Sequence, residues 1–174
     1  AKHGRKKVTV VHKANVVRAT DGLFLDEAKK VAKDFPAITF DEANVDAICM
    51  WLLKNPHSYE VLVAPNLYGD IISDLAAQMV GGLGFACSGN IGTKLAVFEP
   101  SHGSAPKYAG QYKVNPLATI LAAKMMLDWL GEKTMGEKVE RACANVIQAG
   151  KVRTYDMGGS NTTLEMGEAV AKAL

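Results

Sequence analysis

The stretch Val61-Leu-Val-Ala-Pro-Asn-Leu-Tyr-Gly-Asp-Ile-Ile-Ser-Asp74 passes directly from a strand pattern into a helix pattern. Residues 61–63 are a short aliphatic run that is typical of a buried strand. Pro65 and Asn66 then open a helix, which we predict over residues 67–80 because apolar residues recur there at helical spacing. A strand followed at once by an amphipathic helix is the unit from which α/β folds are built.

The same alternation continues on both sides of this stretch and predicts an α/β fold. Further strands are predicted at residues 8–12, 38–40 and 95–98. Further helices are predicted at residues 23–35, 45–53, 117–130, 135–149 and 164–173. We expect Thr20 or Asp21 to act as N-cap of the first helix. Glycines crowd residues 81–92, and this break in the pattern favours a domain junction there.

The composition is that of an ordinary globular protein. The chain has 174 residues, of which 48% are hydrophobic and 22% charged, and this excludes disorder and a coiled coil. A formal net charge of +2, spread evenly along the chain, excludes a strongly basic nucleic-acid binder. The apolar stretches are too short to span a bilayer, so no membrane partner is expected.

The cysteines and the basic start favour the cytoplasm. Cys49, Cys87 and Cys143 stand far apart without a CxxC pair, which supports neither a disulfide framework nor a zinc site. The basic residues 1–7 precede an apolar run that is too short for a secretion signal. We therefore expect a cytoplasmic protein with reduced thiols.

Two aspartates lie four residues apart at the start of the 67–80 helix. Asp70 and Asp74 fall on one helix face, about 5–6 Å apart, where both carboxylates can reach one divalent ion. Mg²⁺ and Mn²⁺ prefer such oxygen ligands. Spacing alone leaves an equal alternative, because the helix dipole also favours acids near a helix N-terminus. Asp46 is a candidate third carboxylate, although on its own it is more typical of a solvated residue.

Lys13 follows the predicted strand at 8–12 directly. A lysine at a strand end is most often simply exposed. Beside a bound cation, however, a partly desolvated lysine can lose its proton near neutral pH and take part in acid–base catalysis. The sequence pattern by itself favours the first interpretation.

Two glycine-containing stretches resemble nucleotide-binding loops. The loop at residues 102–110, His-Gly-Ser-Ala-Pro-Lys-Tyr-Ala-Gly, permits close backbone approach to a ligand, although its composition also fits an ordinary loop. The stretch 82–87, Gly-Leu-Gly-Phe-Ala-Cys, matches half of the dinucleotide fingerprint. Its sixth position is cysteine and no strand leads into it, so we reject a Rossmann interpretation.

Taken together and in this order, the motifs resemble the C-terminal half of the isocitrate and isopropylmalate dehydrogenases, the β-decarboxylating dehydrogenase family. The matching stretches are Val8 to Asn15, Asn66 to Asp74, Gly81 to Gly84 with Ser88 to Gly92, Phe98 to Pro106, and Asn115-Pro116. They cover nearly the whole chain. The Ser-Gly-Asn-Ile-Gly stretch and the Lys-Tyr after Pro106 look closer to isocitrate dehydrogenases.

The resemblance implies roles for particular residues. Asp70 and Asp74 would bind Mg²⁺ or Mn²⁺, with Asp46 joining from the partner subunit of a homodimer. Lys13 would be the acid–base lysine, also acting across the dimer interface, and Asp46 and Asp70 would count with it as catalytic. The cofactor would be held by Asn15, near the nicotinamide and substrate, and by His102, Gly103, Ser104, Ala105, Lys107, Tyr108, Asn115 and Tyr155.

The resemblance also implies a fold and a reaction. Residues 1–80 would be the second half of a small dimerisation domain, and residues 81–174 the C-terminal part of a large doubly wound cofactor domain. The reaction would be oxidative decarboxylation of a 2-hydroxy di- or tricarboxylate, isocitrate to 2-oxoglutarate, with hydride transfer to NAD or NADP. Lys107, Tyr108 and Tyr155 slightly favour NADP, whereas Gly159 stands where NADP enzymes commonly carry an arginine.

Several alternatives remain open from the sequence. The substrate can be isopropylmalate or homoisocitrate, or the chain can be a non-catalytic fragment or a regulatory subunit. Its arginines, at positions 5, 18, 141 and 153, do not cluster as a tricarboxylate site would require. A phosphatase of the haloacid dehalogenase type is disfavoured because the sequence has no Asp-x-Asp nucleophile motif.

Overall fold

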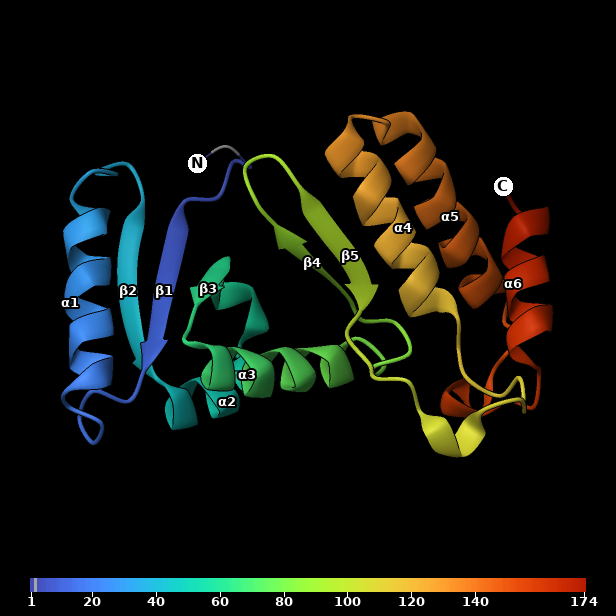
Figure 1. Cartoon of the computed structure of the whole chain (residues 1–174), viewed down its shortest axis with the longest axis horizontal. Helices are drawn as coiled ribbons and strands as arrows, with labels where there is room; N and C mark the ends of the chain where they lie inside the picture. The colour runs from blue at the N-terminus through green and yellow to red at the C-terminus, as the bar shows by residue number, and fades with distance from the viewer. Residues whose placement is uncertain (2) are drawn as a thin grey trace. The chain divides into compact units, whose positions relative to one another are not determined.

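The computed structural model of the chain describes residues 1 and 3–174, which form two compact units, Ala1–Ala76 and Ala77–Leu174. Lys2, one of the basic residues at the start, lies outside the described residues. Figure 1 follows the alternation of strands and helices along the chain. The assignment of residues 1–80 and 81–174 to parts of two domains of a longer enzyme stays a prediction.

The first unit contains a three-stranded parallel sheet in the order β2-β1-β3. Its strands are β1 (Lys7–His12), β2 (Thr39–Asn44) and β3 (Val61–Val63). Parallel strands need long crossover connections, and here α1 (Thr20–Ala32) joins β1 to β2, while α2 (Val45–Lys54) and a 3₁₀ turn (Pro56–Ser58) join β2 to β3. The three strands predicted in this region are therefore confirmed.

Apolar side chains cover both faces of this sheet. One face packs against α2 and α3 (Asn66–Met79) through Val11, Ile48, Leu52 and Ile72, which form a buried cluster. The other face, with Val8, Val10 and Val63, borders an apolar cleft of about 470 Å³ beneath α1. Burial on both sides explains why β1 has a continuous β-branched run and no alternation of polar and apolar residues.

The predicted N-cap of α1 is wrong. The N-cap position is Ala19, which offers no side-chain hydrogen bond, and both Thr20 and Asp21 lie inside the first turn. Asp21 accepts a hydrogen bond from the backbone N–H of Lys13 instead. Its carboxylate thus accepts a hydrogen bond from the turn that precedes α1 and not from the free N–H groups at the start of its own helix.

The second unit packs three helices beside a β-hairpin, as Figure 1 shows. The hairpin strands are β4 (Cys87–Ile91) and β5 (Ala96–Pro100). The helices are α4 (Leu117–Leu130), α5 (Lys133–Ala149) and α6 (Thr163–Lys172), and 3₁₀ turns cover Pro106–Tyr108 and Tyr155–Met157. Helix α4 contacts both the hairpin and α5, which in turn contacts α6. None of the helices in the described part of the chain is both long and apolar enough to cross a membrane.

Strand β4 was not predicted, because its sequence Cys-Ser-Gly-Asn-Ile carries few strand-forming residues. Its apolar cover comes from the partner strand. Gly89 pairs with Phe98, and a Cβ on Gly89 would lie 3.1 Å from the Phe98 ring. The Phe98 ring also contacts Trp129 of α4, with 6.3 Å between centroids. Because residue 89 is a glycine, the Phe98 ring can lie across β4, a strand with few large apolar side chains of its own.

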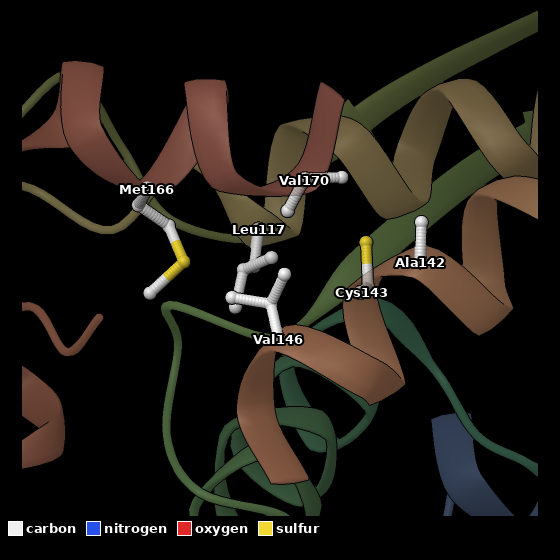
Figure 2. Close-up of a cluster of buried hydrophobic side chains, with 6 residues drawn as sticks. All are labelled: Leu117, Ala142, Cys143, Val146, Met166 and Val170. Atoms are coloured by element: carbon white, nitrogen blue, oxygen red, sulfur yellow. The ribbon is translucent and has the colours of Figure 1, made fainter. Parts of the chain in front are cut away.

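The core of the second unit lies between its three helices, and Figure 2 shows its buried side chains. These residues are Leu117 from α4, Ala142, Cys143 and Val146 from α5, and Met166 and Val170 from α6. Helix α6 begins at a capping box, in which the Thr162 hydroxyl and the Glu165 carboxylate satisfy one another's backbone N–H groups. The helices predicted at 117–130, 135–149 and 164–173 are confirmed.

Candidate active site

Lys13 and Asp46 form an ion pair in the first unit. Lys13 directly follows β1, Asp46 lies in the first turn of α2, and the Lys13 Nζ contacts the Asp46 Oδ1. The Lys13 side chain is 23% exposed and that of Asp46 is 67% exposed, so the pair lies at a surface and not in the core. The hydrogen bond from Lys13 lowers the pKa of Asp46 from its ordinary value of 3.8, and the carboxylate is ionised at neutral pH.

Asp70 and Asp74 lie one helical turn apart on α3, and both are exposed. The Asn66 amide, at the start of the helix, donates to the Asp70 Oδ2 at 3.4 Å, and Asp74 remains open to solvent. The chemistry of this donor set fits a hard divalent ion. Mg²⁺ in particular is usually held by one or two carboxylates together with waters and substrate oxygens.

Asp46 does not join these two aspartates within the chain. Among residues 1 and 3–174, no three His, Cys, Asp or Glu side chains converge on a common point that could hold a metal ion. Asp46 is paired with Lys13 instead. The expectation that Asp46 reaches the metal from a partner subunit therefore stays a prediction.

A common location links these residues. Lys13 follows β1, Asp46 follows β2 by two residues, and Asn66, which opens α3, follows β3. The three strands are parallel neighbours, so all these side chains belong to the carboxyl edge of one sheet. This edge is where open α/β sheets bind their ligands.

The second unit contains a cavity of about 560 Å³. Six residues from the predicted cofactor set line it: His102, Gly103, Ser104, Ala105, Asn115 and Tyr155. Ala105 has φ +45°, a left-handed conformation that is uncommon for a residue with a side chain and that tends to occur at functional loops. Asn15 lies exposed in the first unit, so its expected place beside the nicotinamide stays a prediction.

Asn115 organises one wall of this cavity. It is 4% exposed, its Oδ1 accepts the backbone N–H of Leu117 at 3.0 Å, and its Nδ2 donates to the Asp156 Oδ2 at 3.0 Å. The Thr154 hydroxyl donates to the other Asp156 oxygen at 2.5 Å. Gly84 packs against the pair, because a Cβ there would come within 2.3 Å of Asp156 and 3.0 Å of Asn115.

Two cavity features were missed by the sequence analysis. Asp156 carried no motif signal of its own, and only its hydrogen bond to Asn115 reveals it. Gly82 and Gly84 line the cavity although they are not a Rossmann loop. The rejection of that loop is confirmed, since the glycines follow helix α3 and not a strand. The position of these glycines directly after the predicted helix, and not after a strand, was the signal that could have indicated another kind of glycine-lined cavity wall.

Lysines and tyrosines gather beside the cavity. The rings of Tyr108 and Tyr155 lie 5.6 Å apart between centroids. The Lys113 Nζ lies 5.0 Å from the Tyr108 centroid and 5.1 Å from that of Tyr155, and the Lys107 Nζ lies 4.8 Å from Tyr108. Within the described part of the chain, neither lysine forms an ion pair, so both ammonium groups are available to an anion.

Gly159 cannot carry a side chain in this conformation. A Cβ at this position would lie 2.2 Å from the backbone oxygen of Arg153. The Gly159 N–H donates to the Thr154 carbonyl at 3.0 Å, which holds the turn in this close approach. A long side chain at position 159 would therefore require the turn to move.

Comparison with known proteins identifies the family and the fold. The family model described as "Isocitrate/isopropylmalate dehydrogenase" matches residues 1–170. The chain belongs to the isocitrate/isopropylmalate dehydrogenase family. The resemblance inferred from the motifs is confirmed, and so is the mixed α/β fold. A crystal structure of isocitrate dehydrogenase from Methylococcus capsulatus matches with a TM-score of 0.94 and 45% identity, over 99% of this chain and 51% of that one.

Relatives in the isocitrate/isopropylmalate dehydrogenase family carry several names. The isocitrate/homoisocitrate dehydrogenase of Thermus thermophilus is 54% identical over 98% of this chain and 51% of its own length. The 3-isopropylmalate dehydrogenase of Archaeoglobus fulgidus is 48% identical over 99% of this chain and 53% of its own. Mitochondrial relatives include a catalytic NAD subunit from Arabidopsis thaliana and a regulatory subunit from Dictyostelium discoideum, at 49% and 44% identity. The chain spans about half the length of these relatives.

Proposed function

We propose that this chain is part of a metal-dependent dehydrogenase that oxidises and decarboxylates a 2-hydroxy acid, with isocitrate as substrate and NAD(P) as hydride acceptor. The observation that carries the proposal is the pair of exposed carboxylates, Asp70 and Asp74, one turn apart on α3. Two oxygen ligands for a divalent ion, together with an acid–base lysine from a second subunit, would match the needs of this reaction.

Asp70 and Asp74 would hold the divalent ion, as Mg²⁺ or Mn²⁺. Their carboxylates are exposed and one turn apart, and Asn66 supports Asp70. A bound divalent ion would polarise the hydroxyl and carboxylate oxygens of the substrate. Two carboxylates leave room in the coordination sphere for those substrate oxygens.

Lys13 would move the proton of the substrate hydroxyl. The Asp46 carboxylate holds the Lys13 Nζ in one direction, so the nitrogen is oriented before the substrate arrives. As the family resemblance implies, we propose that Lys13 and Asp46, which form an ion pair, serve the site of a second subunit in a homodimer.

The cavity of the second unit would hold the adenosine end of the cofactor. Asn115 and Tyr155 offer an amide and an aromatic ring at its wall, and the backbone at 102–105 approaches closely. Lys107 and Tyr108 would meet the 2′-phosphate of NADP, which slightly favours NADP over NAD. Gly159 opposes this preference, because it offers no cation. Some relatives are named as NAD-dependent and some as mitochondrial enzymes, so NADP and the cytoplasm remain predictions.

Steady-state kinetics of the complete enzyme that contains this chain tests the proposal. Isocitrate, homoisocitrate and 3-isopropylmalate are compared with NAD and with NADP, with Mg²⁺ present or removed by a chelator. We expect isocitrate to give the highest kcat/KM and turnover to require Mg²⁺. A higher kcat/KM for either other acid would correct the substrate. No turnover of any acid would favour a regulatory subunit and overturn the proposal.

A further inference from the structure

Asp21 is a buried acid to which neither the motifs nor the proposed reaction gives a role. It lies in the first turn of α1 and is 6% exposed. Removing an ionised carboxylate from water is costly unless hydrogen bonds compensate for the lost hydration. Asp21 does not cap its helix, so its compensation must come from other contacts.

The main contact of Asp21 is with the backbone of Lys13. The Lys13 N–H donates to the Asp21 Oδ2 at 2.7 Å, a short hydrogen bond of the charge-assisted kind. The Thr20 hydroxyl donates to the other oxygen at 3.4 Å. The carboxylate therefore ties the start of α1 back to the first residue after β1.

The remaining polar groups around Lys13 are fixed by the turn itself. The Lys13 carbonyl accepts the N–H groups of Val16 and Val17 at 2.9 and 2.8 Å. The Nδ1 of the buried His12 accepts the Ala14 N–H at 3.0 Å. Among these groups of the described chain, the Lys13 N–H is the one that bonds to a side chain from α1, so Asp21 links the helix to the backbone where it leaves the strand.

Asp21 also faces the helix that carries the proposed metal ligands. Its carboxylate lies near the phenol of Tyr68 in α3. The buried carboxylate thus bonds to the strand end that bears Lys13 and faces the helix that bears Asp70.

We infer that Asp21 is a positioning residue that fixes the direction of the Lys13 side chain toward Asp46. The catalytic consequence of this inference rests on the proposed role of Lys13. The placement of Lys13 by Asp21 does not. Asp21 acts through the Lys13 backbone and through its position between β1 and α3, and it contacts neither substrate nor cofactor.

Placement is tested by amine labelling of the 174-residue chain, which needs no activity. The variants are Asp21→Ala, Asp21→Asn, which keeps a carbonyl acceptor, and Asp26→Asn, a control on the exposed side of α1. Reductive methylation with peptide mapping gives the rate at Lys13, and Lys29, which pairs with Glu42, is the internal reference. We expect faster labelling of Lys13 alone in Asp21→Ala, and rates close to those of the parent in the other two variants.

Unchanged labelling of Lys13 in a folded Asp21→Ala chain would overturn the inference. If Asp21→Ala loses its circular dichroism and labels both lysines faster, Asp21→Ser takes its place. Serine is polar enough for the start of α1 and too short to reach the Lys13 N–H. Faster labelling of Lys13 alone in this variant supports the inference, and an unchanged rate overturns it.

The catalytic consequence is measured in the complete enzyme. We expect Asp21→Ala to lower kcat about 100-fold, as misplacement of a catalytic group by roughly 1 Å can do, with little change in cofactor KM. Asp21→Asn should restore most of that loss. If Lys13→Met leaves kcat unchanged while the labelling result holds, the proposed function fails and the placement by Asp21 stands. An equal loss in kcat and cofactor affinity in Asp21→Ala would indicate a general structural role and overturn the inference.

Discussion

Gly84 lies so close to Asp156 that a single added carbon would touch the carboxylate at 2.3 Å. We therefore expect Gly84→Ala to push Asp156 away from Asn115 and to destabilise the second unit by about 1–3 kcal/mol, the usual cost of overpacking. Adenosine binding should weaken in the same variant. Gly103→Ala is the matched control, because Gly103 lines the same cavity and an added Cβ there meets nothing within 4 Å. Equal stability of the two variants by chemical denaturation would contradict this account.

Lys13→Met tests the acid–base role. Methionine keeps the length of the side chain and removes the amine, so kcat of the complete enzyme should fall by about 10²–10⁴-fold while cofactor affinity changes little. Steady-state kinetics and equilibrium cofactor binding measure the two effects separately. Lys29→Met, on the surface of α1, is the control. A parallel loss of kcat and cofactor affinity would point to a structural role for Lys13.

Asp70→Asn tests the metal site. An amide in place of the exposed carboxylate removes one negative charge from the donor pair and leaves the helix intact, so Mg²⁺-dependent turnover should be abolished. Circular dichroism should remain that of the parent, and calorimetry with Mg²⁺ measures binding directly. Asp34→Asn removes an acid elsewhere in the same unit and should change neither. Full activity of Asp70→Asn at saturating Mg²⁺ would refute the assignment.

Lys107→Asp tests the cofactor preference. If the Lys107 ammonium meets the 2′-phosphate, the change should lower kcat/KM for NADP relative to NAD by at least about tenfold, since a hydrogen bond to a charged group contributes about 1.5–3 kcal/mol. Lys94→Asp, in the turn of the β4–β5 hairpin, controls for net charge. An unchanged ratio of the two kcat/KM values would show that Lys107 does not bind the 2′-phosphate.

Gly159→Arg tests whether the arginine of NADP enzymes can be restored in this chain. We expect loss of stability and no gain for NADP, because the new Cβ would collide with the Arg153 backbone. The cost should be at least about 1 kcal/mol. Ser160→Arg adds the same charge at the next, exposed position and should be tolerated. A stable Gly159→Arg enzyme with improved NADP kinetics would overturn this reading of the turn.

The Lys13–Asp46 pair predicts a particular acid titration. The pKa of Asp46 is lowered, so the stabilising contact is present above about pH 3.8 and is lost only as the pH falls through the lower folded-state value. Carbon-detected NMR titration of aspartate carboxyls should place Asp46 below 3.8, and Lys13→Met should return it toward that value. An unshifted carboxyl in the parent chain would mean that the ion pair does not persist in solution.

Much of the fold can be predicted from the sequence, because its dominant signals are local. Parallel strands buried on both faces, such as β1, leave a continuous β-branched run, and α5 carries a clear helical period. Strand β4 leaves no such signal, since its cover is the Phe98 ring of another strand. The true cap position of α1 was hidden for a similar reason, because Asp21 bonds to Lys13 across a turn.

The residues of the candidate site also divide into those with a local sequence signal and those that only tertiary contacts reveal. Four of the six predicted residues that line the cavity, His102 to Ala105, are consecutive in one loop. Asn115 and Tyr155 lie farther along the chain and were predicted only from the family resemblance. Asp156 lies about forty positions from Asn115 and enters only through tertiary contact. Asp46 and Lys13 likewise meet through neighbouring strands, and the sequence alone favoured a solvated residue for each.

The apolar cleft beneath α1 affects how the isolated 174-residue chain can be studied. Environment-sensitive dyes fluoresce when they bind in an apolar cleft, so the native chain would give high dye fluorescence before any heating. Dye-based melting curves would then start from a raised baseline and conceal the transition. Far-ultraviolet dichroism, or the emission of Trp51 and Trp129, is the sounder readout for comparing variants of this chain.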